Sequence, residues 1–132
     1  MNKRIVIIGV VLIVTAIILG AFGAHALKEI LSDTKLKSFE TGVRYQMYHG
    51  LAFLILGLNE KRFSFSMNYV YIFTLMGIVF FSASIYGLAM QEVVNVSLKF
   101  LGPITPVGGL MLIIGWILFM VKLIKQKENE TF

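Results

Sequence analysis

The sequence predicts an all-α, polytopic integral membrane protein: a bundle of four transmembrane helices with an amphipathic surface helix in its first loop. Its composition, 58% apolar and 14% charged over 132 residues, is well outside the range of soluble globular proteins. Four apolar segments are also each about long enough to cross a bilayer, at residues 5–24, 42–58, 68–90 and 102–121. We therefore expect a single membrane domain that occupies residues 1–132.

The first span, residues 5–24, follows the basic pair Lys3 and Arg4. This arrangement also resembles a secretory signal, but an apolar run of about 20 residues is longer than a usual signal core, so we interpret it as a span. Small residues recur within the first and the fourth span, and such faces let membrane helices approach closely. The residues that we expect at these packing faces are Ala16, Gly20, Gly23, Ala24, Gly108 and Gly115.

The second span is the least apolar, because its only apolar run, residues 47–58, is too short to cross the bilayer and includes His49. To cross the bilayer, its helix must carry Arg44 and His49 in with it. Apolar residues recur at helical spacing upstream as well, so we expect one helix from about residue 32 to residue 58, capped by Ser32. Its first two turns are expected to lie on the membrane surface.

The third and fourth spans, residues 68–90 and 102–121, bring further polar residues to one depth. Counting from Asn59 at 1.5 Å per residue places Arg44 about 22 Å and His49 about 15 Å along the second helix. The same count from the other span ends places Gly20, Ser82 and Val107 near the height of Arg44. We therefore predict a polar layer in the half of the membrane nearer the first and third loops.

The candidate ligand-binding residues lie in this layer, and each has a structural alternative. Arg44 could hold an anionic group, or it could reach the interface and pair with Glu40, because a buried arginine costs about 2.5 to 3.5 kcal/mol without a partner. His49 could instead be a structural histidine, and the tyrosines could belong to an interfacial belt. The predicted set is Arg44, Tyr45, His49, Ser82, Tyr86 and Thr105.

From this layer we predict a membrane protein that binds a small anionic or amphipathic molecule, or a lipid, in its outward half. Gly20 and Gly23 would leave room for the molecule. One alternative is an assembly or stabilising subunit of a larger membrane complex, or a homo-oligomer. Another is a haem or redox-cofactor protein that uses His25 and His49, although the same count places these side chains about 15 Å apart in depth. We predict no metal and no cofactor.

The charges and the motifs exclude other classes. Lys and Arg flank the spans and form no stripe with interleaved aromatic residues, so the expected partners are membrane lipids and not nucleic acid. No glycine-rich phosphate loop, metalloprotease helix or nucleophile elbow is present, so we do not predict an enzyme. The side that holds both termini has the larger set of basic residues, which predicts cytoplasmic termini: Lys3, Arg4, Lys61, Arg62, Lys122, Lys125 and Lys127.

Four blocks of this sequence resemble a known family. They are GAFGAHAL at residues 20–27, TGVRYQMYHGLA at 41–52, FSASIY at 81–86 and GPITPVGG at 102–109, followed by Trp116. Together they resemble the bacterial membrane family called domain of unknown function 423, whose eukaryotic relative is transmembrane protein 256. The resemblance implies a small multi-span protein of the bacterial plasma membrane, and it brings no assigned activity.

Overall fold

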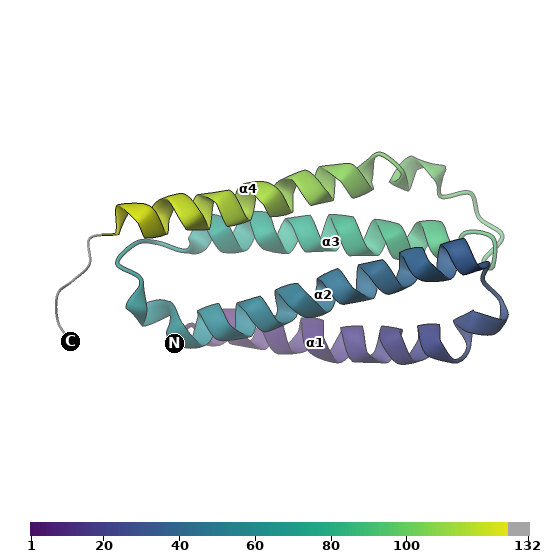
Figure 1. Ribbon diagram of the computed structural model, residues 1–132, viewed down its shortest axis with the longest axis horizontal. Helices are drawn as coiled ribbons and strands as arrows, with labels where there is room; N and C mark the ends of the chain where they lie inside the picture. Colours follow the sequence, from purple (N-terminus) through teal and green to yellow (C-terminus); the bar gives the residue numbers. More distant parts are fainter. Residues whose placement is uncertain (127–132) are drawn as a thin grey trace.

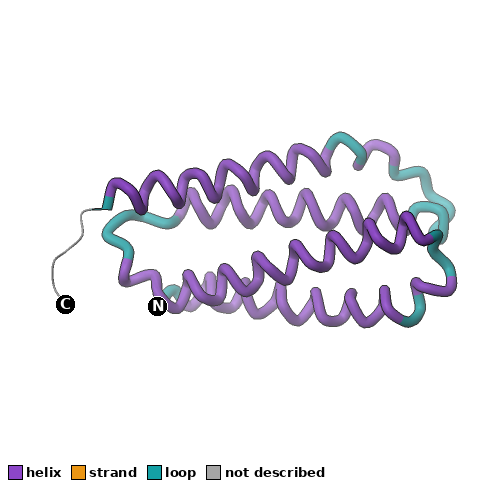
Figure 2. The backbone as a smooth tube through the Cα atoms, viewed as in Figure 1, coloured by secondary structure: helices purple, strands orange, loops and turns teal. Residues whose placement is uncertain are grey.

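The computed structural model describes residues 1–126, and all regular elements in this part of the chain are helices, without strands. Lys127, which we counted among the basic residues near the termini, lies outside the described residues. Four long helices are joined by short loops that contain single turns of 3-10 helix (Figure 2). The elements are α1 (Lys3–Ala24), η1 (Leu27–Glu29), α2 (Asp33–Asn59), η2 (Glu60–Arg62), α3 (Asn68–Met90), η3 (Lys99–Leu101) and α4 (Ile104–Lys125).

The second helix begins where its cap predicts. Ser32 is extended, and its hydroxyl oxygen accepts a hydrogen bond from the Lys35 amide at 3.4 Å. From there α2 continues without a break to Asn59, so the amphipathic segment of the first loop is the start of α2 and not a separate helix. Whether its first turns rest on a membrane surface stays a prediction.

The four helices form two antiparallel hairpins that meet along α2 and α3. α1 packs on α2 and α4 packs on α3, while α1 and α4 lie at opposite edges of the molecule (Figure 1). The N-terminus, the α2–α3 connection and the end of α4 lie at one end, which we call the terminal end. The α1–α2 and α3–α4 connections lie at the other, which we call the distal end. The arrangement is therefore an open array of helices, since no α1–α4 interface closes it.

Glycines set the distance between the helices within each hairpin. A Cβ atom on Gly9 of α1 would lie 2.7 Å from the Leu54 amide nitrogen and 2.8 Å from the Gly50 carbonyl oxygen of α2. In the second hairpin, a Cβ on Gly77 of α3 would lie 2.8 Å from the Leu112 amide nitrogen of α4. Real Cβ atoms do not approach so closely, so only glycine allows these backbones to touch.

The packing face of α1 differs from the predicted one. Ala16 and Gly23 are buried as expected, but Gly20 is only half-buried and Ala24 is exposed. The small residues that α1 buries are Gly9, Ala16 and Gly23, seven residues apart. Residues seven positions apart are separated by two turns and lie on nearly the same side of a helix. A seven-residue repeat of small residues can therefore contact an antiparallel partner along the whole helix. In α4, Gly108 and Gly115 are buried as predicted, and they have this spacing too.

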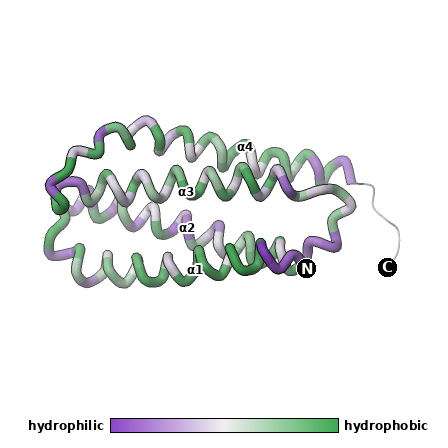
Figure 3. The backbone as a smooth tube through the Cα atoms, turned by 180° about the vertical axis from the view of Figure 1, so that it is seen from behind, coloured by the Kyte–Doolittle hydropathy of each residue, from purple (hydrophilic) through white to green (hydrophobic). Residues whose placement is uncertain are grey.

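Three of the four helices are long and apolar enough to cross a membrane. They are α1, α3 and α4, the first and last together with the adjoining turns. α2 is as long but carries polar residues, and its hydrophilic stretches stand out between apolar neighbours (Figure 3). One apolar cluster, around Phe53, Met67 and Tyr71, lies at the terminal end, and a second, around Leu27 and Phe39, lies at the distal end. Between them lies a layer of polar contacts.

Candidate ligand-binding site

Gln46 of α2 lies at the centre of the polar layer. Its side chain is buried, and its Nε2 donates hydrogen bonds to the Thr15 hydroxyl at 2.6 Å and the Leu12 carbonyl at 3.1 Å, both on α1. Its Oε1 accepts a hydrogen bond from the Tyr86 hydroxyl of α3 at 2.7 Å. One amide therefore links three helices. Sequence reasoning missed this role, although Gln46 shares the buried face of α2 with Gly42, Phe53 and Gly57.

Three predicted ligand-binding residues use their hydroxyls to join helices. Tyr86 donates to Gln46, and the Ser82 hydroxyl donates to the Gly42 carbonyl of α2 at 2.7 Å. Thr105 at the start of α4 shares a hydrogen bond with Ser84 of α3, at 2.6 Å. Satisfied polar groups of this kind hold membrane helices in register. Their geometry supports a structural role for Ser82, Tyr86 and Thr105.

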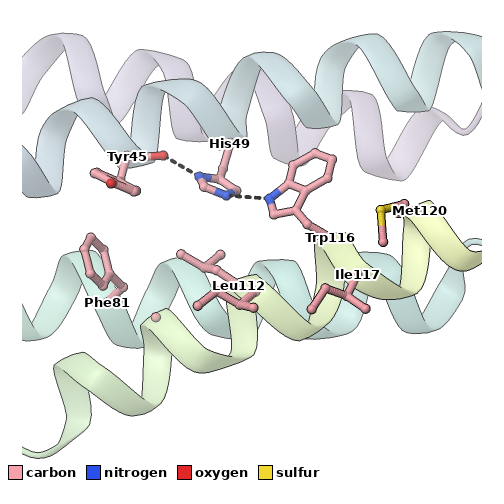
Figure 4. A pocket seen from close by; sticks show the side chains of 9 residues that line it. Tyr45, His49, Phe81, Leu112, Trp116, Ile117 and Met120 are labelled. Carbon is pink, nitrogen blue, oxygen red and sulfur yellow. Dashed lines mark hydrogen bonds between the residues drawn. The ribbon is translucent and has the colours of Figure 1, made fainter.

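His49 has a partner for each ring nitrogen. Nδ1 lies 2.7 Å from the Tyr45 carbonyl oxygen, and Nε2 lies 3.0 Å from the indole nitrogen of Trp116 on α4 (Figure 4). An indole N–H can only donate and a carbonyl can only accept, so the imidazole is neutral with its proton on Nδ1. The structural alternative for His49 therefore fits the geometry, with Trp116 as a partner that the sequence did not reveal.

A groove of about 610 Å³ opens beside this pair, between α2 and α4 and over Phe81 of α3 (Figure 4). Tyr45 forms its distal end, where its ring lies 4.9 Å from that of Phe81. Tyr45 is 42% exposed, and its hydroxyl has no hydrogen-bond partner within the described residues. The other lining residues are almost all apolar: His49, Gly109, Leu112, Ile113, Trp116, Ile117 and Met120.

Arg44 does not line this groove. It faces a smaller notch of about 240 Å³ between α1 and α2, lined by Gly20, Gly23, Phe39, Glu40 and Val43. Arg44 and Gly20 thus meet as the depth count predicts, but Tyr45 and His49 lie on another side of α2. The ion pair with Glu40, the structural alternative for Arg44, is not formed, and Arg44 Nη2 donates a long 3.5 Å hydrogen bond to the Thr41 hydroxyl. The predicted single site is therefore divided among a groove, a notch and an internal network.

The geometry does not favour haem bound between the two histidines. His25 caps the end of α1 at the distal end and is exposed, whereas both nitrogens of His49 are already hydrogen-bonded. Ligation of iron by His49 would require it to release Trp116 or Tyr45. Within residues 1–126, no three His, Asp or Glu side chains are grouped as a metal site would require.

Comparisons with known proteins agree with a membrane role. Residues 19–109 match the family described as a protein of unknown function, DUF423. A UPF0382 membrane protein of Staphylococcus epidermidis is 41% identical over 93% of this chain and 97% of its own. Similar proteins from Staphylococcus haemolyticus and Staphylococcus aureus are 38% and 41% identical over the same shares. No solved structure matches this chain.

Proposed function

Because the chain belongs to the DUF423 family, whose bacterial relatives are named membrane proteins, we propose that it binds a lipid or another amphipathic molecule within the membrane. In this proposal the apolar part of the molecule lies in the α2–α4 groove. The protein is a multi-pass protein of the bacterial plasma membrane, it has both termini in the cytoplasm, and it acts as a binding protein and not as an enzyme.

The proposal includes a fourth crossing, by α2. α2 lies between α1 and α3 and spans the same distance from the terminal end to the distal end (Figure 1). If α1 and α3 cross the bilayer, a helix packed along both of them crosses it as well. The basic residues near the terminal end then lie in the cytoplasm: Lys3, Arg4, Lys61, Arg62, Lys122 and Lys125.

The groove is the observation that supports binding. Its lining runs along α4 from Gly109 to Met120, about 16 Å at 1.5 Å per residue, and therefore follows the helix axis. In a bilayer this direction is also that of the lipid chains. The volume lies within the range of about 300 to 1,000 Å³ that is usual for small-molecule sites. A single extended hydrocarbon chain fits these properties, with its polar end near the free hydroxyl of Tyr45.

Two matched substitutions on α4 test the groove. Ile113 and Leu110 are both 57% exposed, but only Ile113 lines the groove. Ile113→Phe adds a ring to the groove and should reduce the amount of lipid that stays bound after mild detergent extraction, measured by native mass spectrometry. Leu110→Phe adds a ring outside the groove and should leave the bound lipid unchanged. Equal lipid retention by both variants and the wild type would contradict the proposal.

The single tryptophan offers a second readout. Trp116 is the only tryptophan of the chain and lines the groove, so its fluorescence reports on that site alone. Lipids with brominated chains should quench Trp116 strongly in the wild type and less in Ile113→Phe. Unchanged quenching in Ile113→Phe would mean that the quenching chains reach Trp116 by another path.

A further inference from the structure

The exposed face of α2 changes character along its length. Toward the distal end it carries Lys37, Glu40, Arg44 and Tyr48, and toward the terminal end it carries Leu51, Ile55 and Leu58. These residues recur three or four positions apart, so they follow one side of the helix. A charged stripe on the outer side of a membrane helix requires a polar group beside it, from protein or from lipid headgroups.

The notch between α1 and α2 brings opposite charges to one place. Arg44 and Glu40 both line it, one turn apart on α2, and both are exposed. Arg44 and Glu40 form no ion pair with each other, and the one ion pair among the described residues joins Lys35 to Glu92. The guanidinium and the carboxylate are therefore both available to a third group in the same notch.

Glycines of α1 form the floor of the notch. A Cβ on Gly20 would lie 3.4 Å from Val43 Cγ1, and one on Gly23 would lie 3.3 Å from the Phe39 ring. Larger side chains on these two residues would press against α2 and narrow the notch of about 240 Å³. The absence of side chains leaves room beside Arg44 for a group about the size of a phosphate ester.

The depths of the two charges match the order of groups in a phospholipid. Arg44 lies about 22 Å from Asn59, roughly 8 Å below the distal surface of a hydrocarbon layer about 30 Å thick. Its long side chain reaches from there to the headgroup level. Glu40 lies one turn, about 6 Å, nearer the surface. In a phospholipid the phosphate lies nearer the chains and an amine, if present, lies farther out.

From this arrangement we infer that the notch holds the zwitterionic headgroup of an amine-bearing phospholipid. Arg44 binds the phosphate, Glu40 accepts hydrogen bonds from the primary ammonium group, and the glycerol lies over Gly20 and Gly23. The inference rests on the proposed crossing of α2, but it concerns a different face from the α2–α4 groove. A quaternary ammonium group cannot donate such hydrogen bonds, so the site should favour phosphatidylethanolamine over phosphatidylcholine.

The test compares lipids of different headgroups with identical chains. Purified protein is placed in nanodiscs of equal parts phosphatidylethanolamine, phosphatidylcholine and phosphatidylglycerol, and the lipids that remain bound are counted by native mass spectrometry. We expect phosphatidylethanolamine to be enriched roughly two- to fivefold in the wild type, the range that one partly exposed ion pair supports. Equal binding of phosphatidylethanolamine and phosphatidylcholine, or enrichment of phosphatidylglycerol, would overturn the assignment.

Three substitutions locate the effect. Glu40→Gln should abolish the preference for phosphatidylethanolamine over phosphatidylcholine, and Arg44→Gln should abolish the enrichment of any headgroup. Lys37→Gln is the control, because Lys37 is exposed on the same face but does not line the notch. An equal loss in Lys37→Gln would assign the preference to general surface charge and overturn the site. If Arg44→Gln does not fold, the comparison of Glu40→Gln with Lys37→Gln still tests whether the notch selects the headgroup.

Two further comparisons distinguish a lipid in the notch from a soluble ligand there and from a lipid in the groove. Soluble phosphoethanolamine in excess should leave the bound lipid in place, whereas displacement would assign the notch to a soluble compound and overturn the lipid assignment. Ile113→Phe should keep the headgroup preference, because the groove lies on another side of α2. If Ile113→Phe reduces the amount of bound lipid while Glu40→Gln leaves the headgroup preference unchanged, lipid binding in the groove is supported and the headgroup site in the notch is rejected. If Ile113→Phe changes neither the amount of bound lipid nor the headgroup preference, only the headgroup site in the notch is supported.

Discussion

Gln46 should contribute more to stability than Tyr86, because its amide has three hydrogen-bond partners on two other helices. Hydrogen bonds between membrane helices contribute about 0.6 kcal/mol each on average. Gln46→Leu should therefore lower the free energy of unfolding by about 1–2 kcal/mol, and Tyr86→Phe by about 0.6 kcal/mol. Equilibrium unfolding in mixed micelles measures both. A smaller effect for Gln46→Leu than for Tyr86→Phe would contradict the network.

A second prediction concerns the indole hydrogen bond. Trp116→Phe keeps an aromatic ring but leaves His49 Nε2 without its donor, so the protein should lose about 1–3 kcal/mol of stability. Tyr45→Phe is the matched control in the same groove, because the hydroxyl that it removes has no partner within the described residues. Thermal unfolding followed by circular dichroism compares them. Equal unfolding temperatures for the two variants would show that this hydrogen bond contributes little.

The position of a residue along its helix could be predicted from the sequence, but the side of the helix bundle that its side chain faces could not. Counting from the helix ends brought Arg44 to the level of Gly20, and both line the notch. The same count treated Tyr45 as a neighbour of Arg44, although consecutive helical residues point about 100° apart. Which side of α2 meets α1 and which meets α3 depends on packing between helices. The predicted pocket therefore joined residues that the fold directs to different surfaces.

At the scale of single elements, α2 shows why mean hydropathy alone does not identify a membrane span. Its buried face is lined by Phe39, Gly42, Gln46, Phe53 and Gly57, while its distal exposed face is charged. Averaging the two faces places the helix below the level typical of a span, although its length and its Ser32 cap were predicted correctly. A helix of this kind can cross a membrane only if its charged face meets headgroups or protein.

Two adjacent glycines of α4 provide a test of helix packing. A Cβ on Gly108 would collide with the backbone of α3 at Phe81 and lie 2.9 Å from the Gly77 carbonyl oxygen. A Cβ on Gly109 would meet only the Phe81 ring, at 3.8 Å. Gly108→Ala should therefore destabilise the α3–α4 hairpin by about 1–3 kcal/mol, and Gly109→Ala should be tolerated. The unfolding free energy in detergent measures this difference, and equal values would contradict the close approach.

Spacing alone did not identify the packing face of α1, because several sets of small residues compete there. Ala16, Gly20 and Ala24 have the four-residue spacing common at membrane interfaces, but the helices use Gly9, Ala16 and Gly23. The choice depends on the partner, since Gly50 and Gly57 of α2 continue the same seven-residue pattern and complete the contact. A pattern in one helix therefore predicts an interface less reliably than matching patterns in two.

At the scale of the whole molecule, the open array of helices explains why cavities lie between them. α1 and α4 do not close the bundle, so one side of α2 is left beside α4 with a groove between them. The polar network lies between the apolar clusters of the two ends and ties α2 to each of the other helices. The hairpins can thus remain joined without filling the groove, which leaves space for the lipid chain that we propose.

The membrane crossing of α2 can be tested directly, because the chain contains no cysteine. Thr34 near the distal start of α2 and Ser64 beyond its terminal end are both exposed and uncharged, so each can be replaced by a single cysteine without altering the charge balance. We expect a membrane-impermeant maleimide to label Thr34→Cys in intact cells, and to label Ser64→Cys only after the membrane is permeabilised. The basic residues Lys61 and Arg62 beside Ser64 favour the cytoplasmic side.

Labelling of both cysteines from the same side would show that α2 does not cross the bilayer. Arg44 and Glu40 would then lie at unrelated depths, and the assignment of the notch to a phospholipid headgroup would fail with the four-span topology. The α2–α4 groove would also no longer run parallel to the lipid chains. Labelling from opposite sides, with Thr34→Cys reached from the cytoplasm, would invert the protein but keep α2 across the membrane, so both cavities would face the other leaflet.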